Sequence, residues 1–152
     1  MRVALVLPGQ GSQRPGAGAP WTATPGWSVV ERASEVLGRD VAALLLDADA
    51  EQLRETREAQ LVTFVLSLVV VEALPALDVV AVAGHSLGDL TALVVAGALS
   101  LEDGLHLVAE RGAAMQEACD AEAGTMAAVL GLAPDDVEAA LPDGVWPAND
   151  NA

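Results

Sequence analysis

The residues best suited to covalent chemistry in this chain stand together in the segment Gly84-His85-Ser86-Leu87-Gly88. The segment has the G-x-S-x-G pattern, with a Val-rich run before it and an apolar helical stretch after it. A strand that turns directly into a helix crowds the turn, and glycines let the two arms approach closely. The Ser86 hydroxyl would then lie at a helix N-terminus, where free N–H groups favour negative charge. The pattern predicts a serine nucleophile whose attack creates an oxyanion; the alternative is a tight turn that holds a buried serine.

Two apolar runs are expected to form the strands behind this turn. The first, residues 2–7, is continuous in apolar residues, as buried strands of parallel sheets are. The second begins at Val79 and leads into the turn. The loop Pro8-Gly9-Gln10-Gly11-Ser12-Gln13 ends the first run. Its G-x-G spacing lacks a third glycine and Pro15 follows, which argues against dinucleotide binding.

Helices are expected in the segments that link and follow the two strands. Their predicted ranges are 27–37, 40–46, a short turn over 49–54, 57–74, 87–96, 101–119 and a short helix from 134. The helix over 57–74 is apolar nearly all round from Leu61 onward and should be buried centrally, with Pro75 stopping it. Segments 124–132 and 145–148 are expected to be strands.

One helical face is expected to pack along its whole length. It consists of Leu101, Leu105, Val108, Gly112, Met115 and Cys119, behind a capping-box-like start at Ser100. Cys119, at the end of this stripe, is therefore predicted to be a core residue rather than a nucleophile. Arg111 sits at the edge of the stripe, from where it can reach over the Ser86 turn. The alternative is a solvated arginine paired with Glu110 or Glu117.

Composition limits the class of partner. The formal net charge is -15, and all seven basic residues are arginines, so nothing supplies a basic face for nucleic acid or an anionic membrane. Cys119 is the only cysteine, which suits a reducing compartment. The longest apolar run, 61–71, is too short to cross a bilayer. These features favour a soluble cytoplasmic protein, and His85, His106 and Cys119 lack the spacing of a metal site.

With these motifs in place, the chain resembles the N-terminal half of the malonyl-CoA:acyl-carrier-protein transacylases, the acyltransferases of fatty-acid and polyketide synthesis. The motifs that carry the resemblance, in the family's order, are Pro8-Gly9-Gln10-Gly11-Ser12-Gln13, Gly84-His85-Ser86-Leu87-Gly88, Glu110-Arg111-Gly112 with Met115-Gln116, Gly124-Thr125-Met126-Ala127-Ala128-Val129 and Trp146-Pro147-Ala148-Asn149-Asp150-Asn151.

The resemblance implies an α/β fold. Residues 1–122 would be part of an α/β-hydrolase-like parallel sheet with a nucleophile elbow, and residues 123–152 would begin a ferredoxin-like subdomain. Ser86 would carry malonyl from malonyl-CoA to the phosphopantetheine thiol of an acyl carrier protein, and Arg111 would hold the malonyl carboxylate. The backbone N–H groups of Gln10 and Leu87 would form the oxyanion hole. Supporting residues would be His85, Gly84, Gly88, Gly9 and Gly11, with Asn149 and Asn151 on the substrate side. No permanently bound cofactor or metal is implied.

The chain departs from the family at its general base. The family's base is a histidine in the second half of its domain, and neither His85, inside the turn, nor His106, expected on a solvated face, matches it. Asp89 also stands where the family usually has glutamate. The chain is therefore expected to be truncated or half of a split enzyme, with a complementing C-terminal half as partner. The alternatives are a serine esterase or thioesterase that shares only the elbow, and a non-catalytic half-domain.

Overall fold

The computed structural model describes residues 2–122 and 124–150 as an α/β structure. These residues belong to two compact units, an N-terminal unit that ends at Glu122 and a C-terminal unit beyond it. Among the described residues, no helix is both long enough and apolar enough to span a bilayer.

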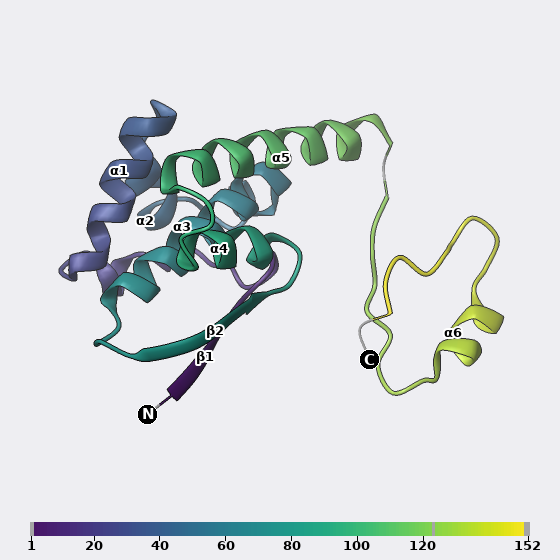
Figure 1. Cartoon of the computed structure of the whole chain (residues 1–152). Coiled ribbons are helices and arrows are strands. Elements are labelled where there is room, and N and C mark those ends of the chain that lie inside the picture. The colour runs from purple at the N-terminus through teal and green to yellow at the C-terminus, as the bar shows by residue number, and fades with distance from the viewer. Residues whose placement is uncertain (1, 123, 151–152) are drawn as a thin grey trace. The chain divides into compact units, whose positions relative to one another are not determined.

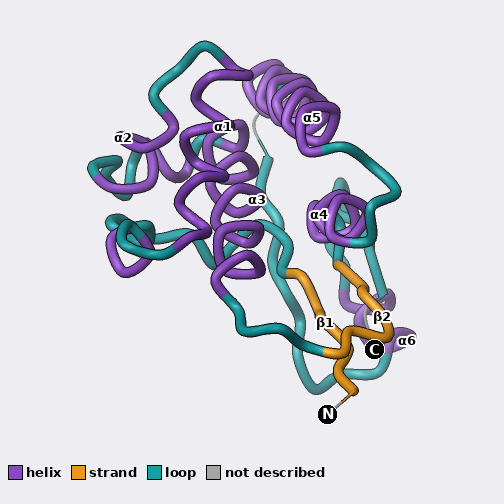
Figure 2. Tube along the Cα trace, turned by 60° about the vertical axis from the view of Figure 1, so that its left-hand side comes forward, coloured by secondary structure: helices purple, strands orange, loops and turns teal. Residues whose placement is uncertain are grey.

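The N-terminal unit places a small parallel sheet beside a group of helices (Figures 1 and 2). Its elements are β1 (Arg2–Leu7), α1 (Ser28–Leu37), α2 (Val41–Leu46), α3 (Thr56–Ala73), β2 (Asp78–Gly84), α4 (Leu87–Val95) and α5 (Leu101–Ala121), with short 3-10 turns at Ala19–Trp21, Pro25–Trp27 and Gln52–Arg54. Helix α3 packs against α1, α2, α4 and α5, so it is the centre of the helical layer.

The two strands pair in parallel, from Arg2 opposite Asp78 to Leu7 opposite Gly84, with one irregularity after Val3. Their carboxyl ends therefore meet at one edge of the sheet. The loop after β1 and the turn after β2 leave from this edge, which is where open α/β sheets place their ligands.

The core of the unit is built around α3, as the sequence predicts. Phe64, Val65 and Val69 are fully buried in it, and residues of α1, α2, α4 and α5 pack around them. Helix α3 ends at Ala73, and Leu74 before Pro75 already has extended backbone angles.

The predicted helix boundaries are confirmed by their capping contacts. Helix α1 ends at Gly38, which has a left-handed φ of 61°. The Asp40 carboxylate accepts a 2.8 Å hydrogen bond from the backbone N–H of Ala43 at the start of α2. The Ser100 hydroxyl accepts a 3.0 Å bond from the N–H of Asp103 at the start of α5.

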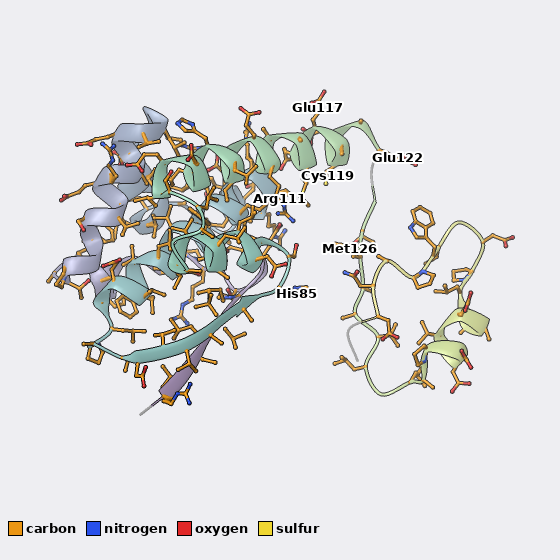
Figure 3. The ribbon with its side chains drawn as sticks, in the orientation of Figure 1. His85, Arg111, Glu117, Cys119, Glu122 and Met126 are labelled. Atoms are coloured by element: carbon orange, nitrogen blue, oxygen red, sulfur yellow. The ribbon has the colours of Figure 1, made fainter. Side chains whose placement is uncertain are left out.

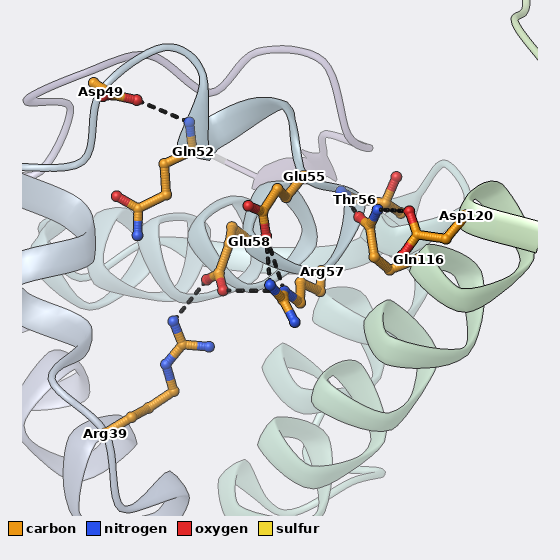
Figure 4. Close-up of polar contacts among 9 residues, drawn as sticks. All are labelled: Arg39, Asp49, Gln52, Glu55, Thr56, Arg57, Glu58, Gln116 and Asp120. Carbon is orange, nitrogen blue, oxygen red and sulfur yellow. Dashed lines mark hydrogen bonds and ion pairs between the residues drawn. The ribbon is translucent and has the colours of Figure 1, made fainter. Parts of the chain in front are cut away.

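Two polar groups tie the N-terminal end of α3 to its neighbours (Figure 4). The backbone N–H of Thr56 donates to the Gln116 side chain of α5 at 2.6 Å, and Gln116 in turn donates to Asp120 at 2.9 Å. The buried carboxylate of Glu58 lies 2.7 Å from Arg39 and 3.6 Å from Arg57. These contacts satisfy groups that would otherwise be buried without a partner.

The prediction that the strand over 2–7 is buried is wrong for most of its length. Only Leu7 is buried in β1, and Val6 is 78% exposed; in β2, Val80 is 48% exposed. Helix α4 contacts both strands. A continuous apolar run is buried on both faces only where further layers cover the sheet, and the described residues cover it incompletely.

The apolar stripe of α5 is also buried over only part of its predicted length. Leu105, Val108 and Gly112 are buried, whereas Met115 and Cys119 are exposed, so the prediction of a core cysteine is wrong. Helices α3 and α5 run antiparallel, with Gly104 beside Phe64 and Gly112 beside Arg57. Because α3 begins at Thr56, opposite Gln116, the last turns of α5 extend beyond it.

Over its described residues 124–150, the C-terminal unit has one helix, α6 (Pro134–Ala140), with Asp135 and Asp136 in its first turn as predicted. The strands predicted over 124–132 and 145–148 are absent from the described residues 124–150, and Met126 is 87% exposed. A strand needs a hydrogen-bonded neighbour, and this described segment supplies none. It therefore does not form the ferredoxin-like arrangement.

Candidate active site

Ser86 has the least usual backbone conformation in the described part of the chain. It lies between the end of β2 at Gly84 and the start of α4 at Leu87, with φ 56° and ψ -108°. It is the only non-glycine among the described residues with a positive φ. Such a conformation costs about 1–3 kcal/mol and persists only where the surrounding structure enforces it. Strained serines of this kind are characteristic of functional turns, and Ser86 is exposed rather than buried.

Two glycines enforce the turn. A Cβ atom on Gly84 would overlap the backbone of Gly88, and one on Gly88 would overlap the carbonyl oxygen of Leu7 in β1. The three backbones are thus in direct contact, and neither position has room for a side chain. This explains the spacing of the G-x-S-x-G motif in physical terms.

The loop after β1 packs on the same turn. A Cβ on Gly9 would lie 2.9 Å from the carbonyl oxygen of His85 and 3.3 Å from its Nδ1. Gln10 and Gly11 follow and are exposed, and Gly11 has a φ of 124°. The side chain of Gln13 accepts a 2.8 Å hydrogen bond from the N–H of Gly11 and donates to the carbonyl of Leu53 at 3.2 Å. The loop that carries Gln10 is therefore held on both sides.

Leu87 begins α4 with its side chain fully buried. The next two N–H groups are used within the turn, because Gly88 donates to the His85 carbonyl at 2.9 Å and Asp89 to the Ser86 carbonyl at 3.1 Å. The N–H of a first helical residue has no acceptor inside its own helix. It lies next to Ser86 and is suited to bind an anion.

Arg111 reaches the turn from α5 (Figure 3). Its Nη2 donates a 2.9 Å hydrogen bond to the Ser86 hydroxyl, and its Nη1 donates to the side-chain oxygen of Gln60. Its hydrogen bonds thus go to Ser86 and Gln60 rather than to Glu110 or Glu117. Residues 25 positions apart in sequence are joined because α5 passes over the N-terminus of α4.

Gln60 is the site residue that the sequence analysis missed. It lies in α3 and is completely buried, yet it carries an amide. The signal that could have found it is this polar residue at the start of the apolar stretch of α3, because buried amides are there for their hydrogen bonds.

The remaining predicted residues lie apart from this contact. His85 is exposed at the turn (Figure 3). His106 is exposed on α5, as predicted. Asn149 belongs to the C-terminal unit, and Asn151 lies outside the described residues. In the described part of the chain, no group of three or more His, Cys, Asp or Glu side chains is arranged to hold a metal ion.

Comparison with known proteins identifies the family to which this chain belongs. Residues 4–152 match the family described as the acyl transferase domain. The chain is 39% identical over 135 residues to the malonyl CoA-acyl carrier protein transacylase of Bacillus subtilis, covering 86% of this chain and 43% of that protein.

Solved structures of the same kind of enzyme also resemble this chain. An acyl-carrier-protein-S-malonyltransferase from Bartonella henselae matches with a TM-score of 0.76 and 32% identity, covering 91% of this chain and 47% of that one. A malonyl-transacylase in complex with its type II polyketide synthase acyl carrier protein matches with a TM-score of 0.66 and 38% identity, covering 76% and 39%. The chain thus spans less than half the length of each of these three relatives. From the match over almost its whole length, the chain belongs to the acyl transferase domain family, and the relatives it resembles are malonyl-CoA–acyl carrier protein transacylases.

Proposed function

We propose that this chain is the nucleophile-bearing part of a malonyl transacylase, in which Ser86 carries malonyl from malonyl-CoA to the thiol of an acyl carrier protein. The observation that carries the proposal is the strained, exposed Ser86 with its hydroxyl hydrogen-bonded to Arg111. The turn then acts as a nucleophile elbow of the α/β-hydrolase type. The names of the similar proteins, one of them in complex with its carrier protein, support the same substrates.

In the first half-reaction, the Ser86 oxygen attacks the thioester carbonyl of malonyl-CoA and loses its proton to a base. The carbonyl oxygen becomes an oxyanion, which the N–H groups of Leu87 and Gln10 stabilise. The carbon–sulfur bond then breaks, the CoA sulfur takes up a proton, and malonyl remains as an ester on Ser86. In the second half-reaction, the phosphopantetheine thiol of the carrier protein gives its proton to the base and its sulfur attacks the ester carbonyl. The bond between the carbonyl carbon and the Ser86 oxygen then breaks, malonyl remains on the sulfur as a thioester, and the Ser86 oxygen takes the proton back.

Arg111 is the residue that selects a diacid. A guanidinium can bind a carboxylate through two parallel hydrogen bonds, and the Arg111 group already lies 2.9 Å from the nucleophile. The free carboxylate of malonyl would take this position and leave the Ser86 hydroxyl available to react. An acetyl group has no carboxylate and would leave the cation with the neutral Gln60 amide but without a negatively charged partner in a partly desolvated site.

The general base is assigned to a complementing C-terminal part. The chain covers 43% of the length of the B. subtilis relative, and the partner of the Ser86 hydroxyl in the described residues is an arginine, which cannot accept a proton. A base delivered by the complementing part would approach the exposed side of Ser86.

The test is intact mass spectrometry of the purified chain after incubation with malonyl-CoA, alone and with a separately expressed C-terminal part of a relative. We expect a malonyl-sized mass increase that is largest with both parts present and absent in Ser86→Ala. Acylation that survives Ser86→Ala would refute the proposal. No acylation of the folded chain in either mixture would favour a non-catalytic half-domain.

The esterase alternative is distinguished by the same arginine. A simple esterase needs no cation beside its nucleophile, so Arg111→Ala would leave hydrolysis of an uncharged p-nitrophenyl ester unchanged. A transacylase of the proposed kind loses malonyl loading in Arg111→Ala. The Arg111–Ser86 hydrogen bond favours the transacylase.

A further inference from the structure

Gln60 is a polar side chain in the buried part of α3. It is completely buried, and its neighbours Ala59 and Leu61 on α3 are buried as well. Burying an amide costs free energy unless its hydrogen bonds are made inside the protein. A leucine or methionine would fill the same volume without this cost. The amide is therefore best explained by the groups that it binds.

Both ends of the amide bind residues of α5. The oxygen accepts from Nη1 of Arg111, and the nitrogen donates to the sulfur of Met115 at 3.2 Å. These two partners are four residues apart, so they lie on one face of α5. A guanidinium has only donors, and a thioether has only an acceptor. The amide can therefore satisfy both partners in only one orientation.

The same guanidinium joins this buried anchor to the nucleophile. Nη1 of Arg111 faces Gln60 while Nη2 lies 2.9 Å from the Ser86 hydroxyl. Arginine has several freely rotating bonds, and fixing them costs conformational entropy. A buried acceptor at one nitrogen fixes the plane in which the other N–H groups point.

We propose that Gln60 is a positioning residue that holds the Arg111 guanidinium in the orientation that selects a carboxylate-bearing acyl donor. The inference rests on the proposed function, because the donor is the one assigned there. The neutrality of the amide matters as much as its geometry. A glutamate at position 60 would hold the guanidinium equally well but would pair with its charge, which would then attract a donor carboxylate less.

Three substitutions separate these effects. Gln60→Met keeps the length of the side chain and removes its strong hydrogen bonds. Gln60→Glu keeps a hydrogen-bond acceptor for Arg111 and adds a negative charge. Thr63→Val is the matched control, because Thr63 lies one turn along α3, is buried, and its hydroxyl has no hydrogen-bond partner among the described residues.

The first measurement does not depend on activity. In the chain labelled with ¹⁵N-arginine, the side-chain signals of Arg111 are identified by their loss in Arg111→Lys. In the parent and in Thr63→Val, we expect guanidinium N–H groups that exchange slowly with water and give separate signals. In Gln60→Met, we expect rotation of the guanidinium group to average these signals into one. Should Gln60→Met fail to fold, Met115→Leu, which removes only the acceptor that orients the amide, replaces it. Unchanged Arg111 signals in a folded variant would overturn the proposal.

The second measurement compares acylation of Ser86 by malonyl-CoA and by acetyl-CoA in single turnovers, with the C-terminal part added. The free energy of a hydrogen bond to a charged group corresponds to about a 10- to 100-fold change in a binding constant or rate. We expect the malonyl-to-acetyl rate ratio to fall by that amount in Gln60→Glu, with folding intact, and to stay at the parent value in Thr63→Val. A parent-like ratio in Gln60→Glu would refute the role of Gln60 in selection. Absence of acylation in the parent would instead refute the proposed function, and the arginine signals would still decide the positioning role.

Discussion

The helical layer and the strand pair of the N-terminal unit differ sharply in how completely they are packed. Around α3, large side chains such as Phe64 are fully buried, and the buried carboxylate of Glu58 is paired with arginines. In the strands, Val6 and Val80 keep much of their apolar surface exposed. The helical layer therefore contains a buried core, whereas the strand pair leaves apolar side chains exposed.

This difference places the candidate site at the boundary between the two parts. Ser86 follows a strand of the open pair, whereas Arg111 and Gln60 belong to the packed helices. The helical side can hold the Arg111 cation in one orientation because the Gln60 amide that binds it is fully buried. The strand side offers exposed apolar surface and unpaired edges, which favour association with other polypeptide.

The largest expected effect tests the packed side. Phe64→Ala should lower the free energy of unfolding by about 4 kcal/mol, because it removes a large, fully buried side chain and leaves a cavity in the core. Val6→Thr, on the open strand, should change it by less than about 0.5 kcal/mol. Urea unfolding followed by circular dichroism measures both. If both variants lost the same free energy of unfolding, the strands and the helices would be equally well packed, which would contradict the structure.

A somewhat smaller effect is expected at the boundary. Gly88→Ala brings a Cβ atom into the carbonyl oxygen of Leu7, and backbone cannot rotate away as a side chain could. We expect a loss of about 3 kcal/mol in the free energy of unfolding, together with loss of Ser86 acylation. Gly124→Ala is the control, since a Cβ there meets nothing within 4 Å. A Gly88→Ala variant with parent-like stability would contradict the close approach of β1 and α4.

The hydrogen bond between Thr56 of α3 and Gln116 of α5 should contribute less to the free energy of unfolding than the close approach at Gly88. Gln116→Ala removes the acceptor of the Thr56 N–H at the start of α3 and should cost about 1 kcal/mol, as loss of a helix cap does. Glu117→Ala changes the next residue of α5, which is exposed, and serves as the control. Thermal unfolding of the two variants measures the difference. If Gln116→Ala and Glu117→Ala melt alike, the cap contributes nothing.

The smallest effect concerns a surface pair between α1 and α5. Hydrogen bonding to its own backbone N–H, and then to the Arg32 guanidinium 2.8 Å away, lowers the pKa of Glu102 from its ordinary value of 4.5. A carboxyl group whose pKa falls on folding stabilises the protein above its unfolded pKa, and this stabilisation is lost as the pH falls through the folded pKa. Glu102→Gln should therefore be slightly less stable than the parent at pH 7. Its difference from the parent should vanish in acid and shrink in high salt. A difference that grows on acidification would contradict the lowered pKa.

The sequence predicted the helical elements well, and the tail and the strand environment poorly. The starts of α2 and α5 depend on the capping residues Asp40 and Ser100, which act within a few residues of themselves. The burial of the apolar run in β1 depends on what lies on both sides of a sheet, which local pattern does not contain. The exposed Cys119 is a similar case, because its apolar stripe continues past the point where α3 begins.

The amino-acid sequence by itself determined the Ser86 turn. Its glycine spacing, the apolar strand before it and the helix after it act over a few residues, and the backbone contacts at Gly84 and Gly88 show why those positions exclude side chains. Only the tertiary structure decided what surrounds the serine. Arg111 could have paired with a neighbouring glutamate on its own helix, and Gln60 carried no motif at all. The packing of α5 across α3 and α4 brings the arginine to Ser86 and the buried amide to the arginine, because contacts between distant segments depend on how helices cross.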